Sequence, residues 1–332
     1  MSMQRDTQTT PNTPEPDVRL RIVPTMEDAQ RTAAVLAALG AGEVVLFGSV
    51  ARGHAEPGSD IDLIVIYDDL DYNTRNRKEN ELVAVAGDYV DCRLDLYVID
   101  RPEWKMRTRQ VVTSFQRWAR LEGTVLHSRP PSGPINWDKK MVLPTSDYQQ
   151  ALSRLPNIDS KLREMASEVP DRRFPRRESD TWWAEDRRQG WKRGCRAAHD
   201  AIELSIKALI NLAADPDKPA WGKDIRGHIT NLPRPHQTNI TSLLEPIGID
   251  NLSRWHEKAH RRGHPTGATQ QQFLTAIEAA CSTASYTASQ FNPELPKVEE
   301  LQQTITSIHN LKDHYHQHLD EHPDPQETPQ SQ

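Results

Sequence analysis

The chain has 332 residues and a formal net charge of −6, and 36% of its residues are hydrophobic while 27% are charged. This length suits two domains, and the composition excludes a wholly disordered or fibrous chain. No apolar run approaches the roughly 20 residues that cross a bilayer, and the negative charge argues against a surface that binds polyanions without selectivity. We therefore expect a globular cytoplasmic protein with no membrane partner.

The first 20 residues are rich in Thr, Pro and Gln and lack the apolar core of a secretory signal. Residues 1–20 are therefore predicted to be a disordered leader. Cys92, Cys195 and Cys281 are far apart and form no CxxC pair. This pattern suits neither a disulfide framework nor a zinc site, so each cysteine is expected to be a small buried residue with no disulfide partner.

Hydrophobic periodicity predicts a mixture of strands and helices over residues 21–128, the first domain. Thr25 and Asp28 have the spacing of a capping box, which begins a helix that ends near Gly40. Runs that are β-branched or alternate in polarity predict strands, and an apolar face after Pro102 predicts one helix. These elements are strands over 44–47, 60–67 and 93–100, a helix from Pro102 to Leu121, and a strand over 124–127.

The second half of the chain is predicted to be helical. Three prolines within residues 128–134 exclude the interior of a regular element, which predicts a linker over 129–146. Apolar residues at steps of three and four then predict a bundle over 147–292 and a C-terminal helix over 293–320. The helices are predicted over 152–165, 191–212, 238–244, 251–260, 269–291 and 298–319. Residues 321–332 are predicted to be a disordered tail.

Three carboxylates form a candidate site for divalent metal ions. Asp60 and Asp62 stand two apart on a predicted strand, so both side chains leave the same face. Asp95 on a later strand supplies a third acid. Mg²⁺ or Mn²⁺ would relieve the repulsion between these carboxylates, and a pair of such ions clamps an in-line displacement at phosphorus. Asp95 would bind the second ion or accept the proton of an attacking hydroxyl.

A glycine turn precedes the acidic strand. Gly48 would let a phosphate approach the backbone, and Ser49, at the predicted start of a helix, would offer its hydroxyl and amides to a triphosphate. Taken separately, the turn and the two acids have a purely structural explanation, since acids at a strand start are often only solvated. Their occurrence together, between hydrophobic strands and with a third acid, favours a site.

The string LFGSVARGHAEPGSDIDLIVIY (46–67) resembles the minimal nucleotidyltransferases of the polymerase-β superfamily, and the likeness covers residues 25–127. The resemblance implies an α+β fold class, in which a nucleotidyltransferase domain with a small mixed sheet precedes an all-α bundle. It implies a nucleoside triphosphate as substrate, with ATP as the expected one. Its implied residues are Gly48, Ser49 and Arg52 for the nucleotide and Asp60, Asp62 and Asp95 for catalysis and metal binding. Asp91 competes with Asp95 for the third acidic role.

The second half resembles the helical HEPN domain often paired with such transferases, through AAHDAIELSIKALINL (197–212) and GHITNL (227–232). Some HEPN proteins are ribonucleases with an Arg, four to six residues and then a His. Arg254 and His260 have that spacing, although Trp255 replaces the usual polar residue after the Arg. The resemblance therefore adds a candidate nuclease pair.

Three functions stay open at this point. The first is transfer of a nucleotidyl group to a hydroxyl of a protein or an RNA by two-metal catalysis. The second is modification of a small hydroxylated molecule such as an aminoglycoside, because antibiotic-inactivating transferases share a similar motif and a helical second domain. In the third, the helical part is a ribonuclease or a binding module, and the transferase domain regulates it.

Overall fold

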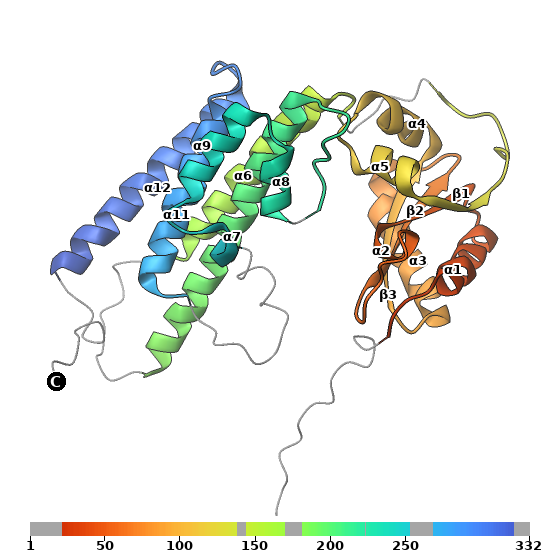
Figure 1. Cartoon of the computed structure of the whole chain (residues 1–332), viewed down its shortest axis with the longest axis horizontal. Helices are drawn as coiled ribbons and strands as arrows, with labels where there is room; N and C mark the ends of the chain where they lie inside the picture. Colours follow the sequence, from red (N-terminus) through yellow and green to blue (C-terminus); the bar gives the residue numbers. More distant parts are fainter. Residues whose placement is uncertain (1–21, 138–143, 170–180, 223, 253–267, 322–332) are drawn as a thin grey trace, which may run out of the picture. The chain divides into compact units, whose positions relative to one another are not determined.

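The computed structural model describes residues 22–137, 144–169, 181–222, 224–252 and 268–321 (Figure 1). The chain forms two compact units, and neither unit is one continuous stretch of sequence. The first contains Met1–Thr108 and Gln116–Val142, and the second contains Arg109–Phe115 and Leu143–Gln332. No helix among the described residues is long and apolar enough to cross a membrane.

A four-stranded mixed sheet forms the centre of the first unit. Its strands are β1 (Glu43–Phe47), β2 (Asp60–Tyr67), β3 (Arg93–Asp100) and β4 (Thr124–Ser128), in the order β3-β2-β1-β4. β2 and β3 are parallel, whereas β1 is antiparallel to both β2 and β4. The predicted strands and the α+β class are confirmed. These strands form because β-branched residues and alternating apolar residues pack well in a sheet.

The two faces of this sheet have different partners. Val44, Leu46, Leu63 and Val65 lie on one face and pack in the same core cluster as residues of α1 (Met26–Ala38) and α3 (Arg75–Ala86). Thr25 caps α1 in the predicted capping box with Asp28. Helix α3 was not predicted, because most of its residues are polar and only a few, such as Leu82, are buried. The other face carries Asp62 and is described with the site below.

The single helix predicted from Pro102 to Leu121 is wrong, because the chain forms α4 (Arg101–Gln110) and α5 (Phe115–Glu122) there. The cause is a distant carboxylate. Asp147 accepts hydrogen bonds from the backbone N–H of Val112 at 2.9 Å and of Thr113 at 3.0 Å, and also from the Thr113 hydroxyl. Amides bonded in this way are unavailable to a helix, so the helix ends before Val111 and a new one begins at Phe115.

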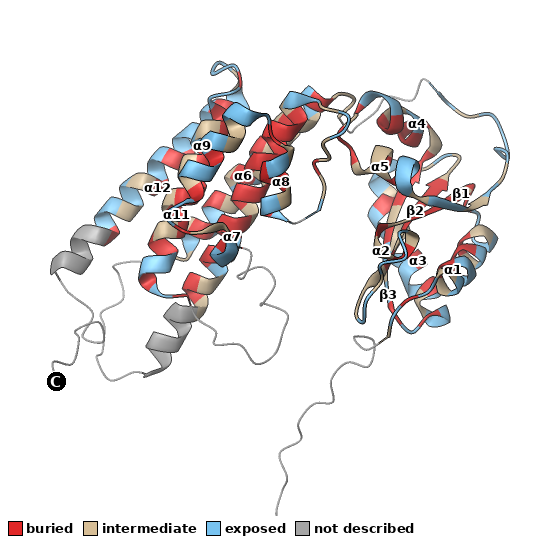
Figure 2. Ribbon diagram, viewed as in Figure 1, coloured by how far each residue is buried: buried red, intermediate tan, exposed pale blue. Residues whose placement is uncertain are grey.

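Helices make up the regular structure that is described in the second unit. Those with both ends among the described residues are α6 (Asp147–Ser167), α7 (Thr181–Ala213), α8 (Ile225–Asn231), α9 (Arg234–Leu244), α11 (Gln270–Ala288) and α12 (Pro296–Glu321). Figure 2 shows buried residues concentrated along α6, α7 and α11, whose apolar side chains share one core. Gly194 brings α7 close to α11, since a Cβ atom there would lie 2.2 Å from the Phe273 ring. Most of the helix predicted over 251–260 lies outside the described residues.

A column of polar side chains is buried along α7. His199, Glu203, Lys207 and Asn211 follow one another at steps of four and are at most 9% exposed. Glu203 pairs with the ammonium group of Lys207, so the helix buries a charge together with its counter-charge. Cys92, Cys195 and Cys281 are buried free thiols, as predicted.

Candidate active site

Three carboxylates meet on the face of the sheet opposite to the one that packs with α1 and α3. Asp60 and Asp62 alternate with the buried Ile61 on β2, so their side chains leave the strand on the same side. In the parallel pairing of β2 with β3, the register places Asp95 directly beside Asp62. One oxygen from each of the three carboxylates lies within 4.8 Å of the others. The structure thus brings together the three acids that the sequence predicted as one site.

Gly48 lies against this cluster. β1 ends at Phe47, which is the partner of Asp62 across the antiparallel pairing, and Gly48 follows with φ = +75°. A Cβ atom on Gly48 would lie 1.9 Å from Oδ2 of Asp62. Only glycine therefore suits both the backbone conformation and the space that the Asp62 carboxylate occupies.

Ser49 and Arg52 follow Gly48 in and after the short helix α2 (Gly48–Ala51). Ser49 is partly exposed, and its backbone carbonyl accepts a hydrogen bond from the N–H of His54 at 2.9 Å. Nη1 of Arg52 lies 3.9 Å from Oε2 of Glu122, and the charge of Arg52 also lowers the pKa of Asp62. Because α2 is a single turn, its helix dipole is small. Any attraction of an anion to this turn would come mainly from the Ser49 hydroxyl and the Arg52 charge.

The electrostatics of the cluster favour a cation. Burial, together with the charges of Asp60 and Asp95, raises the pKa of Asp62 to about 7. The opposing effect of Arg52 does not offset them. Arg93, which the sequence reasoning missed, reaches Asp60 with Nη2 at 3.6 Å from Oδ2. Three convergent carboxylates with a deficit of positive charge are a donor set that hard divalent cations accept.

The geometry groups Asp95, and not Asp91, with Asp60 and Asp62. Asp91 is exposed and precedes β3, whose first residue Arg93 already pairs with Asp60 at the start of β2. The three-carboxylate cluster formed by described residues contains Asp95 and not Asp91. Arg254 and His260, the candidate nuclease pair, lie outside the described residues.

Comparison with known proteins agrees with this geometry. Residues 33–117 match the family model of the nucleotidyltransferase domain, a stretch that includes β1, β2, β3 and all three carboxylates. The matched stretch is about a quarter of the chain, and it is similar to nucleotidyltransferase domains. The family uses a nucleoside triphosphate and a divalent metal. Searches among curated proteins and among solved structures gave no significant match.

Proposed function

We propose that the chain transfers a nucleoside monophosphate from a nucleoside triphosphate, with ATP as the first candidate, to a hydroxyl group of a protein or an RNA. One observation carries the proposal. Asp60, Asp62 and Asp95 converge beside Gly48, within the segment that matches the nucleotidyltransferase family. In this reaction a bond forms between the acceptor oxygen and the α-phosphorus, the bond from that phosphorus to pyrophosphate breaks, and the acceptor loses its proton.

The carboxylates are assigned to metal binding. Asp60, Asp62 and Asp95 would hold Mg²⁺ or Mn²⁺, and the raised pKa of Asp62 supports this assignment because a cation would offset both the burial and the carboxylate repulsion that raise it. When bound, such ions neutralise phosphate charge and polarise the phosphorus–oxygen bonds. Asp95 is exposed, whereas Asp60 and Asp62 are partly buried, and this exposure suits Asp95 to accept the proton of an attacking hydroxyl.

The residues after β1 are assigned to the triphosphate. Gly48 leaves room for the Asp62 carboxylate beside the turn, and the backbone of this turn would receive a phosphate oxygen. The Ser49 hydroxyl would donate a hydrogen bond to a phosphate, and the exposed Arg52 would pair with another. Fixed positions for these groups align the α-phosphorus with an acceptor, and alignment of this kind lowers a barrier by several kcal/mol.

The test uses the full chain with each α-labelled nucleoside triphosphate and Mg²⁺, alone and with cell lysate proteins, total RNA or a panel of aminoglycosides. We expect label to transfer to protein or RNA, and no transfer by the Asp62→Asn variant. If only an aminoglycoside is labelled, the acceptor is a small molecule and not a protein or an RNA, while the proposed reaction stands. No label on any acceptor, from a folded chain that contains Mg²⁺, would reject nucleotidyl transfer as its function.

A further inference from the structure

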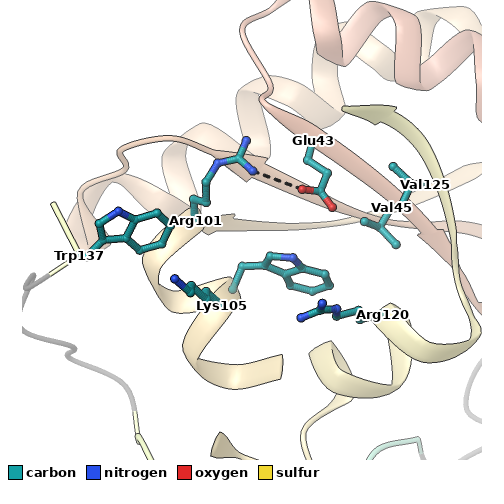
Figure 3. Close-up of a pocket in the computed structure, with 8 residues that line it drawn as sticks. Glu43, Val45, Arg101, Lys105, Arg120, Val125 and Trp137 are labelled. Carbon is teal, nitrogen blue, oxygen red and sulfur yellow. Dashed lines mark hydrogen bonds and ion pairs between the residues drawn. The ribbon is translucent and has the colours of Figure 1, made fainter. Parts of the chain in front are cut away.

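A cavity of about 440 Å³ lies in the first unit, away from the carboxylates (Figure 3). Its volume is within the range of small-molecule sites. Its walls come from Glu43 and Val45 of β1, Val125 of β4, Arg101, Trp104 and Lys105 of α4, Arg120 of α5, and Trp137. Trp137 lies at one end of this pocket, and Val45 and Val125 lie at the other (Figure 3).

The pocket carries two positive charges that no described carboxylate balances. Arg101 is compensated, because its Nε lies 2.9 Å from Oδ1 of Asp68 and its Nη1 lies 3.3 Å from Oε2 of Glu43. Lys105 and Arg120 are exposed, and neither forms an ion pair with an acid in the part of the chain that the structure describes. The surplus therefore suits a ligand with about two negative charges.

The aromatic residues add a surface for a planar ring. Trp137 is 49% exposed, and Nζ of Lys105 lies 4.2 Å from the centroid of its ring. Trp104 is 7% exposed and forms part of the pocket wall. Arg120 is held by a hydrogen bond from Nη1 to Oγ1 of Thr108 at 3.3 Å. Indole rings beside cations are the combination that proteins use to stack a base and pair its phosphate.

The pocket is distinct from the carboxylate cluster although both use the same face of the sheet. Glu43 pairs with Ile66 and Phe47 pairs with Asp62, four residues apart along β1, while Val45, which also lines the pocket, lies two residues or roughly 7 Å from Phe47. Val45 and Ile64, which pair between these points, are at most 1% exposed. The two sites also differ in the sign of their charge, so a ligand in the pocket is not the metal-bound triphosphate.

We propose that this pocket binds a nucleoside phosphate, either as a free nucleotide or as one unit of an RNA strand, without need of a divalent metal. Lys105 and Arg120 pair with the phosphate, whose monoester carries a charge between about −1.5 and −2 at neutral pH. The base lies against the exposed indole of Trp137. The proposal does not depend on the catalytic assignment, because none of these side chains belongs to the carboxylate cluster.

The experiment is a calorimetric titration of the full chain in EDTA with AMP and, separately, with a five-nucleotide oligoadenylate. We expect at least one of them to bind, and Lys105→Gln, Arg120→Gln and Trp137→Ala each to weaken binding about tenfold. Binding should also weaken as salt rises. These three side chains are exposed, so the variants keep the fold. AMP binding identifies a free nucleotide site, and binding of the oligonucleotide alone identifies an RNA site.

Two controls isolate the pocket. Lys78→Gln removes a lysine that also lies over an aromatic ring, 5.7 Å from the centroid of Tyr67, and should leave the affinity unchanged. Asp62→Asn should leave it unchanged as well. The proposal is overturned if neither ligand binds at millimolar concentration, or if a variant that combines Lys105→Gln, Arg120→Gln and Trp137→Ala binds as tightly as the parent. Neither result would contradict the proposal of nucleotidyl transfer. Conversely, an Asp62→Asn variant that is inactive in transfer but still binds AMP would not contradict the proposal for the pocket.

Discussion

Asp62 and Asp95 face each other as direct partners in the parallel pairing of β2 and β3. Residues in register across two strands project from the same face, so this pairing alone unites carboxylates that are 33 positions apart in the sequence. Asp60, two residues before Asp62, completes the cluster. The site therefore depends on the register of one strand pair, and a slip by one residue would turn Asp95 to the opposite face.

The first prediction separates the two candidates for the third acid. Asp95→Asn should lower the transfer rate by a factor of about 100 or more, because several kcal/mol of charge stabilisation are lost. Asp91→Asn should keep the rate within about threefold, since Asp91 lies before β3 and outside the cluster. Both variants remove one exposed acid, so they form a matched pair. The roles are exchanged if Asp91→Asn is inactive and Asp95→Asn is not.

The second prediction concerns Gly48. Gly48→Ala should abolish transfer and cost about 1–3 kcal/mol of stability, because the new Cβ would collide with the Asp62 carboxylate at a positive φ. Gly53→Ala is its control, since Gly53 has φ = +71° and no atom within 4 Å of the added Cβ. The control shares the backbone strain without the collision. Equal activity of the two variants would show that the approach to Asp62 is unimportant.

The third prediction follows from the pKa of Asp62, which is about 7 in the folded chain and 3.8 in the reference state. A carboxyl whose pKa is raised by folding contributes no penalty below pH 4, where both states hold the proton. The penalty grows between pH 4 and pH 7 and is complete above pH 7. Without metal, Asp62→Asn should therefore stabilise the chain at pH 8 by about 2 kcal/mol, after allowance for partial exposure, and hardly at all at pH 4.

Thermal unfolding in EDTA measures this difference across the pH range. Added Mg²⁺ should raise the unfolding temperature of the parent more at pH 8 than at pH 5, because binding requires the ionised carboxylate. The Asp62→Asn variant should gain less from Mg²⁺ at both values. A stabilisation by Asp62→Asn that is the same at pH 4 and pH 8 would contradict the assigned pKa.

The fourth prediction concerns the buried pair on α7. Lys207→Met should destabilise the second unit by about 3–5 kcal/mol, because it leaves the Glu203 carboxylate buried without its ammonium partner. Lys161→Met is the control, since Lys161 is one-third exposed and its pairs with Glu164 and Asp200 are worth about 1 kcal/mol or less. Chemical denaturation gives both values. A double Glu203→Gln and Lys207→Met variant that is no more stable than Lys207→Met alone would argue against the buried charge as the cause.

Sequence reasoning succeeded where the determining interactions are local. The spacing of Asp60 and Asp62 fixes their common face, and the alternating residues over 93–100 predict the strand on which Asp95 lies beside Asp62. The role of Asp95 stays a prediction. Sequence reasoning failed for the helix between Pro102 and Leu121, because the break depends on Asp147, which bonds the amides of Val112 and Thr113 from 34 to 35 positions away. The pattern of apolar residues in that stretch contains no sign of this partner.

The pocket was missed for a related reason. Its cations and aromatic rings come from α4, α5 and Trp137. The distances between these residues along the sequence match no known binding motif. Arg93 was also missed, since the alternation of β3 marks it only as an exposed strand residue. Its contact with Asp60 becomes visible once the register of β2 and β3 is known.

The interruption of the first unit at Arg109–Phe115 limits where the chain can be cut and recombined without dividing a unit. Thr113 is fixed in the second unit by Asp147 and by Asn211, whereas β4, which completes the sheet, comes later in the sequence. A single recombination breakpoint anywhere between residues 109 and 142 therefore separates at least one unit from part of its own chain. A swap of the helical half alone would therefore require a new partner for the loop between α4 and α5.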